Sequence, residues 1–250
     1  MNILLCGCGG RMGAAVAAAA VAAGDRIVAG VDVNPTAAAP YPVFHTPCEF
    51  EGHADVMIDF SHHSALPGLL SYAEKTNTPL VVATTGHTDE EMAMMRDAAQ
   101  RVPIFFSRNM SLGINLLISL CRRAARALGD DFDIEIIEKH HNKKLDAPSG
   151  TALMIADALS ADAAEDHPYV YDRHAERRQR ARGEIGLHAV RGGTIVGEHE
   201  VLFCGKDEVI TLSHSAASRE VFATGALRAA RFLCGKPAGF YSMDDVVGNL

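Results

Sequence analysis

Six consecutive residues near the middle of the chain carry two imidazoles and three amines. The segment Lys139-His140-His141-Asn142-Lys143-Lys144 is the densest cationic cluster in a chain that is otherwise acidic. Histidine can give or take a proton near neutral pH, and lysine attracts anions. The segment therefore suits an anionic substrate and a reaction that needs a proton. A solvated basic loop is the alternative, and it would be the better explanation for an isolated histidine.

A predicted helix begins directly after this cluster. Ser149 has the residue type of a helix N-cap, and Pro148 restricts the loop that enters it. The backbone N–H groups of Gly150 and Thr151 would then point outward from a helix N-terminus, which favours carboxylates. The cationic cluster and the helix N-terminus together predict a site for a substrate with more than one carboxylate.

A glycine-rich turn near the N-terminus is the second candidate site. The sequence Gly7-Cys8-Gly9-Gly10-Arg11-Met12-Gly13 connects an apolar run to an alanine-rich segment. Glycines let backbone N–H groups approach a pyrophosphate at the start of a helix. The spacing departs from G-x-G-x-x-G, because Met12 occupies the sixth position and the third glycine follows at Gly13. A turn that serves packing alone is the alternative, but the flanking strand, helix and acidic residue favour a dinucleotide site.

Asp32 bears on the choice of cofactor, because it ends the second apolar run. A carboxylate in this place accepts hydrogen bonds from ribose hydroxyls and repels a 2′-phosphate. The next residues, Val33-Asn34-Pro35, include no basic side chain. The sequence thus favours NADH, while Arg11 in the glycine loop leaves NADPH open.

The elements expected to hold the glycine loop alternate between strand and helix. Apolar runs predict strands over residues 3–6, 26–31, 55–60, 80–84 and 104–106, with helices over 11–23, 64–74 and 89–101. Strands this apolar, separated by helices, indicate a parallel sheet covered on both faces. The predicted class is α/β, with a Rossmann-type doubly wound parallel sheet.

The second half of the chain has a different rhythm. Helices are expected over residues 113–128, 149–159 and 219–233, and strands over 132–138, 185–190, 195–203 and 209–214. Residues 166–182 are polar and arginine-rich, which predicts an exposed, solvated loop. Strands in succession with tight turns indicate a second, α+β domain with a mixed, mostly antiparallel sheet.

Composition excludes several classes of protein. The chain has 250 residues, 48% of them apolar, and its net charge of −8 argues against a nucleic-acid partner. The longest apolar run, residues 14–23, is too short to cross a bilayer, and we expect neither a membrane segment nor a secretory signal. Six scattered cysteines without a C-x-x-C pair predict a cytoplasmic protein with neither a disulfide framework nor a metal site.

The segment from Lys139 to Ala152 resembles the signature of the 4-hydroxy-tetrahydrodipicolinate reductase (dihydrodipicolinate reductase) family. The glycine loop is similar to the cofactor loop of that family. Three further segments, residues 83–86, 109–115 and 195–199, match in the same order. The matches run nearly end to end, and the segment from His140 to Thr151 is the most specific of them.

The resemblance implies a nicotinamide-dependent reduction of 4-hydroxy-tetrahydrodipicolinate to tetrahydrodipicolinate in the diaminopimelate route to lysine. His140 would be the proton donor and acceptor, and Lys144 a proton donor that also holds the substrate. His141, Gly150 and Thr151 would bind a carboxylate of a small dicarboxylate substrate. The residues expected to contact the dinucleotide are Gly7, Cys8, Gly9, Gly10, Arg11, Met12, Asp32, Ala83, Thr84, Thr85, Arg108, Asn109, Met110 and Ser111.

The family also implies a homotetramer of two-domain subunits. The dinucleotide-binding domain would comprise residues 1–111 and 219–250, and the substrate-binding and oligomerisation domain residues 112–218. Two departures stand out: Ala83 replaces a common glycine, and Val33 is not basic, which weakens the case for NADPH.

Two other functions remain open at this point. Another nicotinamide oxidoreductase, such as an amino-acid dehydrogenase, would explain the glycine loop but not the cationic segment 139–144. A nucleotide-sensing protein without turnover would not need both proton-transfer candidates, His140 and Lys144. Arg219, at the start of the last predicted helix, is a further candidate for the active site.

Overall fold

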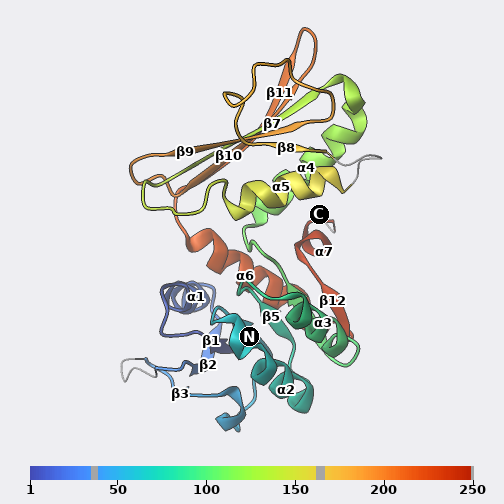
Figure 1. The fold of residues 1–250 in the computed structure, drawn as a ribbon. Helices are drawn as coiled ribbons and strands as arrows, with labels where there is room; N and C mark the ends of the chain where they lie inside the picture. Colours follow the sequence, from blue (N-terminus) through green and yellow to red (C-terminus); the bar gives the residue numbers. More distant parts are fainter. Residues whose placement is uncertain (35–38, 162–166, 249–250) are drawn as a thin grey trace. The chain divides into compact units, whose positions relative to one another are not determined.

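The computed structural model describes residues 1–34, 39–161 and 167–248. The chain forms two compact units: unit 1 contains Met1–Leu112 and Glu220–Leu250, and unit 2 contains Gly113–Arg219. Figure 1 shows the course of the chain through both units. The first and last parts of the sequence therefore fold together, while the segment between them forms its own core.

A seven-stranded parallel sheet forms the centre of unit 1. Its order is β12-β6-β5-β4-β1-β2-β3, and all neighbouring strands run parallel. The strands are β1 (Asn2–Cys6), β2 (Arg26–Val31), β3 (Val43–Phe44), β4 (Val56–Asp59), β5 (Leu80–Val82), β6 (Pro103–Phe106) and β12 (Gly239–Tyr241). The central strands are buried on both faces, as a parallel sheet requires. The predicted Rossmann-type architecture is confirmed.

Helices cover both faces of this sheet. On one face, α1 (Arg11–Ala22) and α6 (Glu220–Leu233) contribute Val16, Ala20 and Leu227 to a core with strand residues. On the other face, α2 (Leu66–Thr76) and α3 (Asp89–Ala98) contribute Leu69 and Met95 to a second core. The short helices are α7 (Met243–Val247) and the 3-10 turns η1 (Pro47–Glu49) and η2 (His63–Ala65).

Three short elements of unit 1 were not among those expected from the sequence: β3, β12 and α7. Each has too few residues for a hydrophobic period to appear. β12 extends the sheet because Phe240 pairs with Ile104 of β6, a contact between residues far apart in the chain. Tertiary pairing defines β3 and β12, whereas α7 begins at a local capping box formed by Ser242 and Asp245.

Unit 2 contains a five-stranded mixed sheet in the order β11-β10-β7-β9-β8. The strands are β7 (Asp133–His140), β8 (Tyr169–Val170), β9 (Ile185–Arg191), β10 (Gly197–Cys204) and β11 (Val209–Ala216). β10 runs antiparallel to β7 and β11, whereas β9 runs parallel to β7 and β8. Although β9 and β10 are consecutive in the chain, β7 lies between them, so the turn at Gly192-Gly193 does not close a hairpin. β7 is thus a central strand, and it ends at His140.

Two helices pack on one face of this sheet (Figure 1): α4 (Leu112–Leu128) and α5 (Gly150–Ser160). Ile118 and Ile155 of the helices bury against Ile136, Val201 and Phe203 of the strands. A 3-10 turn, η3 (Gly129–Asp131), links α4 to β7. α5 is the next helix after β7 in the chain: β7 ends at His140 and α5 begins at Gly150.

The arginine-rich segment is exposed, as expected, but the expectation of a freely solvated loop is wrong. Residue 166 lies outside the described residues, and Tyr169–Val170 forms β8 within the predicted loop. Arg173 and Arg180 pair with Glu135 of β7 at 2.5 and 3.1 Å. Arg178 pairs with the buried Glu184 at 2.5 Å. Glu135 on β7 and Glu184, directly before β9, hold these arginines, and the charge pattern of the segment alone did not predict these contacts.

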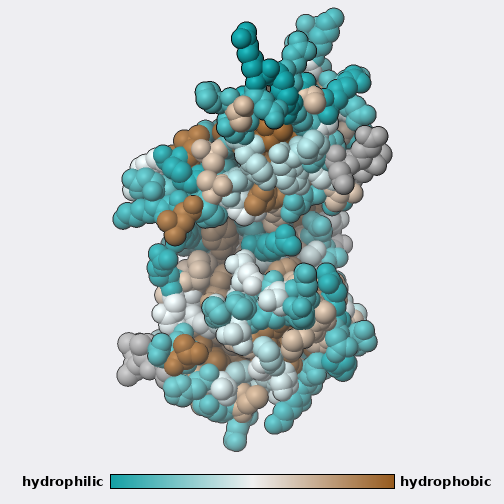
Figure 2. Space-filling view, viewed as in Figure 1, coloured by the Kyte–Doolittle hydropathy of each residue, from teal (hydrophilic) through white to brown (hydrophobic). Residues whose placement is uncertain are grey.

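The surface agrees with a chain that buries its apolar side chains in three cores. On the face drawn in Figure 2, hydrophobic side chains form small separate areas among hydrophilic ones. Within residues 1–34, 39–161 and 167–248, the helices are all too short or too polar to cross a bilayer.

Candidate active site

The predicted dinucleotide residues gather at one edge of the unit 1 sheet. The glycine loop follows β1, Asp32 follows β2, residues 83–85 follow β5, and residues 107–111 follow β6. Because the strands are parallel, all these segments leave from their carboxyl ends. Sheet order reverses beside β1, and ligands of such sheets bind at that point.

The glycine loop brings backbone against backbone. Gly7 has φ +75°, and a Cβ there would lie 2.4 Å from the carbonyl oxygen of Phe60. A Cβ on Gly13 would lie 2.3 Å from the carbonyl oxygen of Gly7, so the shifted third glycine allows α1 to pack directly on the loop. Gly10 stands at the N-cap of α1 and offers no side chain to the first amides of the helix. These amides and the macrodipole fit an anionic pyrophosphate.

Asp32 is held beside this loop by two backbone amides. Its carboxylate accepts the N–H of Gly9 and the N–H of Asn34, each at 2.9 Å. Each carboxylate oxygen keeps a further lone pair for a ribose hydroxyl. The residues present therefore fit the adenosine half of a nicotinamide dinucleotide, with a fixed negative charge where a 2′-phosphate would lie.

The end of β4 lies beside the start of the loop after β5, where the N–H of Ala83 donates to the carbonyl oxygen of Asp59 at 2.9 Å. Asp59, at the end of β4, accepts the N–H of Ser61 at 2.9 Å and its hydroxyl at 2.5 Å. Burial raises the pKa of Asp59, and the two hydrogen bonds from Ser61 oppose that shift. Ala83 and Thr84 are buried, whereas Thr85 is exposed. Thr85 is thus the residue of the predicted 83–85 set that presents its side chain to solvent.

The loop after β6 is shaped by its own side chains. Ser107 Oγ donates to the carbonyl oxygen of Asn109 at 2.7 Å, and the N–H of Ser111 donates to Asn109 Oδ1 at 2.8 Å. Met110 is buried, and a Cβ on Gly225 of α6 would lie 1.7 Å from its carbonyl oxygen. Close contact with α6 therefore fixes this loop, while Arg108 stays exposed.

His62 and His63 lie in the loop after β4, at the carboxyl edge of the sheet. Glu91 of α3 accepts from His63 Nδ1 at 2.9 Å and lies 3.3 Å from His87 Nδ1. The hydrogen bond from His63 is the main cause of the lowered pKa of Glu91. Glu91 thus connects His63, in the loop after β4, with His87, in the loop after β5, which gives His63 a structural role.

In unit 2, His140 is buried at the carboxyl end of β7. Its Nδ1 lies 2.5 Å from Oε2 of Glu138, which is fully buried two residues earlier on the same strand. Arg191, opposite His140 in the register of β9, donates to both oxygens of Glu138 at 2.8 and 2.6 Å. Burial acts to raise the pKa of Glu138, but the hydrogen bonds from Arg191 and His140 outweigh it, and the net shift is downward. Glu138 is therefore ionised at neutral pH.

Ser149 caps α5, as the sequence predicted. Its hydroxyl accepts the N–H of Ala152 at 3.2 Å, and its own N–H donates to Glu138 Oε1 at 3.0 Å. Gly150 is exposed at the first position of the helix, and Thr151 follows half-buried. The helix N-terminus thus lies beside the His140 network, as an anion site must if it is to serve the same substrate.

His199 of β10 completes this buried cluster. Its ring packs edge-on against His140, with 5.3 Å between centroids, and its Nε2 lies 3.1 Å from Ser149 Oγ. Burial, aided by the proximity of His140, lowers the pKa of His199 from 6.5 to about 4. His199 is consequently an uncharged neighbour of His140 at neutral pH.

This buried imidazole predicts an acid-sensitive fold. The unfolded chain protonates His199 near its ordinary pKa, while the folded chain resists protonation until about pH 4. The stability that the neutral His199 contributes is present above pH 6.5 and is lost as the pH falls toward 4. Over this range the free energy of unfolding should decrease by about 3 kcal/mol. Urea unfolding across this range should show a shallower pH dependence for His199→Gln than for the unmodified chain. His45→Gln replaces an exposed histidine in unit 1 and should keep the full dependence; equal slopes in all three proteins would contradict the prediction.

Lys144 and His141 lie in the loop between β7 and α5. Lys144 Nζ pairs with Asp146 Oδ2 at 2.9 Å, and this contact is the main cause of the lowered pKa of Asp146. Arg219 Nη2 lies 3.3 Å from His141 Nε2. His141 Nδ1 is buried without a hydrogen-bond partner within the described part of the chain. Unit 2 therefore brings together His140, His141, Lys144 and the first residues of α5, and adds Arg219.

Glu138, Arg191 and His199 escaped the sequence-based site prediction. Glu138 carried a local signal, because residues two apart on a strand share a face and this carboxylate shares the buried face with His140. No local sequence pattern indicated Arg191, because its contact with Glu138 arises from the pairing of β7 with β9.

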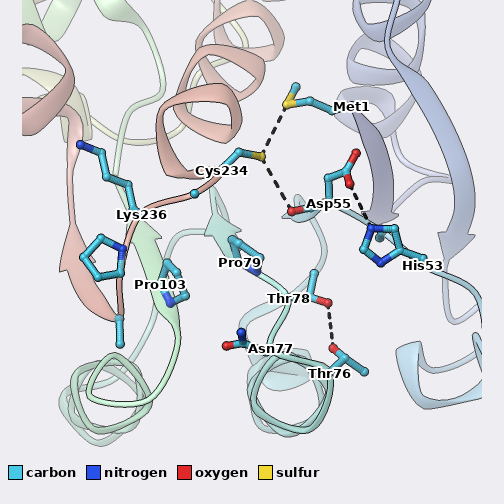
Figure 3. A pocket seen from close by; sticks show the side chains of 14 residues that line it. Met1, His53, Asp55, Thr76, Asn77, Thr78, Pro79, Pro103, Cys234 and Lys236 are labelled. Atoms are coloured by element: carbon cyan, nitrogen blue, oxygen red, sulfur yellow. Dashed lines mark hydrogen bonds and ion pairs between the residues drawn. The ribbon is translucent and has the colours of Figure 1, made fainter.

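A pocket of about 700 Å³ lies at the opposite edge of the unit 1 sheet (Figure 3). Met1, Asp55, Pro79, Pro103 and Cys234 line it, and they precede or flank the amino ends of the strands. In Figure 3 the Cys234 thiol points between Met1 Sδ and the carbonyl oxygen of Asp55, both at 3.8 Å. This pocket is separate from the carboxyl edge that carries the glycine loop.

Comparison with known proteins identifies relatives over the whole chain. The family described as dihydrodipicolinate reductase, N-terminus, matches residues 1–110, and the family of its C-terminus matches residues 113–247. A protein of Caldanaerobacter subterraneus subsp. tengcongensis is 54% identical over 248 residues, 99% of this chain and 98% of the relative. One from Clostridium tetani is 46% identical over 250 residues, 100% of this chain and 98% of the relative. Both are called 4-hydroxy-tetrahydrodipicolinate reductase.

Solved structures share the fold. A dipicolinate-bound dihydrodipicolinate reductase from Paenisporosarcina sp. TG-14 superposes with a TM-score of 0.80 at 23% identity, covering 99% of both chains. A probable dehydrogenase from Thermotoga maritima gives a TM-score of 0.66 at 11% identity, covering 98% of this chain and 92% of the other.

Proposed function

This chain belongs to the dihydrodipicolinate reductase family, and from that premise we propose how its residues divide the work of the reaction. The reaction is the nicotinamide-dependent reduction of 4-hydroxy-tetrahydrodipicolinate to tetrahydrodipicolinate in the diaminopimelate route to lysine. In the proposal, the described part of unit 1 binds the dinucleotide and unit 2 binds the substrate. One observation carries it: His140, Lys144 and the N-terminus of α5 occur together around the end of β7.

The substrate is proposed to bind as a dicarboxylate. Dipicolinate, the ligand named for the Paenisporosarcina structure, has two carboxylates on one ring, and the same class of ligand suits unit 2. The amides of Gly150 and Thr151 hold one carboxylate at the N-terminus of α5, with His141 beside them. Lys144 holds the anion through its ammonium group, in exchange for or in addition to its contact with Asp146. Contacts remote from the reacting carbon align the ring for the chemical step.

His140 is proposed to manage the proton. A bound nicotinamide would supply a hydride, and conversion of the 4-hydroxy substrate to tetrahydrodipicolinate also releases the hydroxyl group as water, so the protein must supply one proton to balance the step. His140 is buried, and the Glu138 carboxylate stabilises its imidazolium form. Lys144 lies in the same loop and can deliver a proton as well as bind the anion.

The dinucleotide is proposed to lie across the glycine loop, with NADH preferred over NADPH. The pyrophosphate would contact the glycine loop, formed by Gly7, Cys8, Gly9, Gly10, Arg11 and Met12. The ribose would contact Asp32. The rest of the dinucleotide would contact Ala83, Thr84, Thr85, Arg108, Asn109, Met110 and Ser111. The fixed carboxylate of Asp32 supports NADH, because like charges brought together cost several kcal/mol. Arg11 is the one basic residue of the loop that supports NADPH.

Asp32→Asn should move this preference toward NADPH. Asparagine keeps an acceptor for one of the two backbone amides, loses the acceptor for the other, and removes the negative charge proposed to face a 2′-phosphate. We expect the ratio of kcat/KM with NADH to kcat/KM with NADPH to fall at least about tenfold. Asp89→Asn, an exposed carboxylate at the start of α3, serves as the control and should leave the ratio unchanged. An unchanged ratio in Asp32→Asn would place cofactor selection elsewhere, with Arg11 as the first candidate.

The direct test of the proposed function is nicotinamide oxidation coupled to a synthase that makes the unstable substrate from pyruvate and aspartate semialdehyde. We expect oxidation that depends on substrate, faster with NADH than with NADPH. An amino-acid dehydrogenase would instead consume an amino acid, and a sensor would bind NADH without turnover. Either result would overturn the proposal.

We further propose a cytoplasmic homotetramer, with residues 112–218 supplying both substrate binding and oligomerisation. This part rests on family membership. Light scattering of the purified chain gives the mass that decides it.

A further inference from the structure

Glu138 makes more contacts than a structural carboxylate of a strand requires. It is fully buried, yet its two oxygens serve two different parts of the site. Oε2 contacts Nδ1 of His140 at 2.5 Å, and Oε1 accepts the N–H of Ser149 at 3.0 Å. One side chain thus connects the proton-transfer residue to the cap of the helix that receives the carboxylate.

Arg191 fixes this carboxylate in place. Its two terminal nitrogens donate to the two oxygens of Glu138, and one of them also donates to the carbonyl oxygen of Asp146 at 2.6 Å. A bidentate arginine–carboxylate pair is rigid as well as strong. Both Glu138 oxygens therefore have defined directions, which a freely rotating carboxylate would lack.

The contact with Glu138 also decides which ring nitrogen of His140 is available. An ionised carboxylate only accepts hydrogen bonds, so Nδ1 must carry a proton and donate it. Nε2 then faces the position of Gly197 in β10, where a Cβ would lie only 3.1 Å away. The missing side chain at Gly197 leaves room at the nitrogen that can exchange a proton.

We propose that Glu138, held by Arg191, is the positioning residue of this active site: it keeps Nε2 of His140 as the proton-transfer atom and, through Ser149, sets the N-terminus of α5 relative to that atom. The proposal rests on the proposed function of His140. It predicts that the proton step and the carboxylate site respond together to a change at Glu138.

The charged and titratable groups around His140 come from several elements. Glu138 lies on the same strand, Arg191 ends β9, and His199 packs from β10 with His214 paired to it on β11. Lys144 and Asp146 lie in the following loop. His199 is uncharged at neutral pH, and Lys144 is paired with Asp146, so Glu138 is the anion in direct contact with the imidazole.

Glu138→Gln tests the proposal, because the amide has nearly the same shape but no charge. We expect kcat to fall about 10²- to 10⁴-fold and KM for the substrate to rise, while the Kd for NADH is unchanged. The limb of the kcat–pH profile that reports loss of the proton donor should move about one to three pH units lower. Arg191→Gln should move that limb the other way, because the imidazolium becomes the main partner of the Glu138 carboxylate.

Glu200→Gln is the matched control, since its carboxylate on β10 pairs with Lys139 at 2.7 Å and has no recorded contact with His140. Its profile should stay in place. An unmoved profile in Glu138→Gln, or movement in the same direction in Glu138→Gln and Arg191→Gln, would overturn the proposal while His140 keeps its role. Should Glu138→Gln fail to fold, the direction found for Arg191→Gln decides. Near-normal turnover in His140→Gln would overturn this proposal and the proposed role of His140 together.

Discussion

Replacing His140 with glutamine should lower kcat about 10²- to 10⁴-fold, the contribution usual for a positioned acid–base group. Glutamine keeps a polar side chain of similar length but does not exchange a proton near neutral pH. The affinity for NADH should not change, because the residues proposed to bind the dinucleotide all belong to unit 1, whereas His140 belongs to unit 2. Steady-state turnover and NADH fluorescence titration measure the two quantities separately.

The control for this variant is His53→Gln, an exposed histidine of unit 1 whose side chain is 80% accessible. It should have normal turnover. A His140→Gln protein with near-normal kcat would refute the assignment of His140. Loss of NADH binding in the same variant would point instead to a general loss of structure, which thermal unfolding would reveal.

Lys144→Ala should lower kcat/KM for the substrate. Removing one partner of a desolvated charge pair costs about 2–5 kcal/mol. Loss of the proposed contact between Lys144 and a substrate carboxylate should therefore lower kcat/KM about 30-fold or more. Both parameters should change, with KM rising as the anion contact is lost and kcat falling if Lys144 also delivers a proton. Initial rates over a range of substrate concentrations separate the two effects.

Lys143→Ala is a matched control one residue away. Lys143 is exposed, whereas the Lys144 side chain is only 21% exposed and is directed into its contact with Asp146. A substrate attracted merely by the charge of the loop would respond equally to both variants. A selective loss in Lys144→Ala is expected, and equal small losses would assign the segment 139–144 to general electrostatic attraction.

The features predicted correctly from the sequence depend on residues that lie close together in the chain. The alternation of apolar runs with helices predicted the parallel sheet of unit 1, because burial on both faces leaves continuous apolar strands. The N-cap at Ser149 was predicted for the same kind of reason, since a hydroxyl and its target amide are three residues apart. The specific segment from His140 to Thr151 indicated the family, which the comparisons confirm.

Only the tertiary structure decided what surrounds His140. Arg191 reaches Glu138 because β9 pairs with β7, and His199 reaches His140 because β10 pairs with β7 from the other side. The chain order of these strands did not predict that β7 would separate β9 from β10. A long-range contact also holds Arg173 and Arg180 of the arginine-rich segment, whose partner Glu135 lies on β7. Local spacing in the sequence specified the chemical groups, whereas strand pairing across long chain separations specified the charges and buried contacts that orient them.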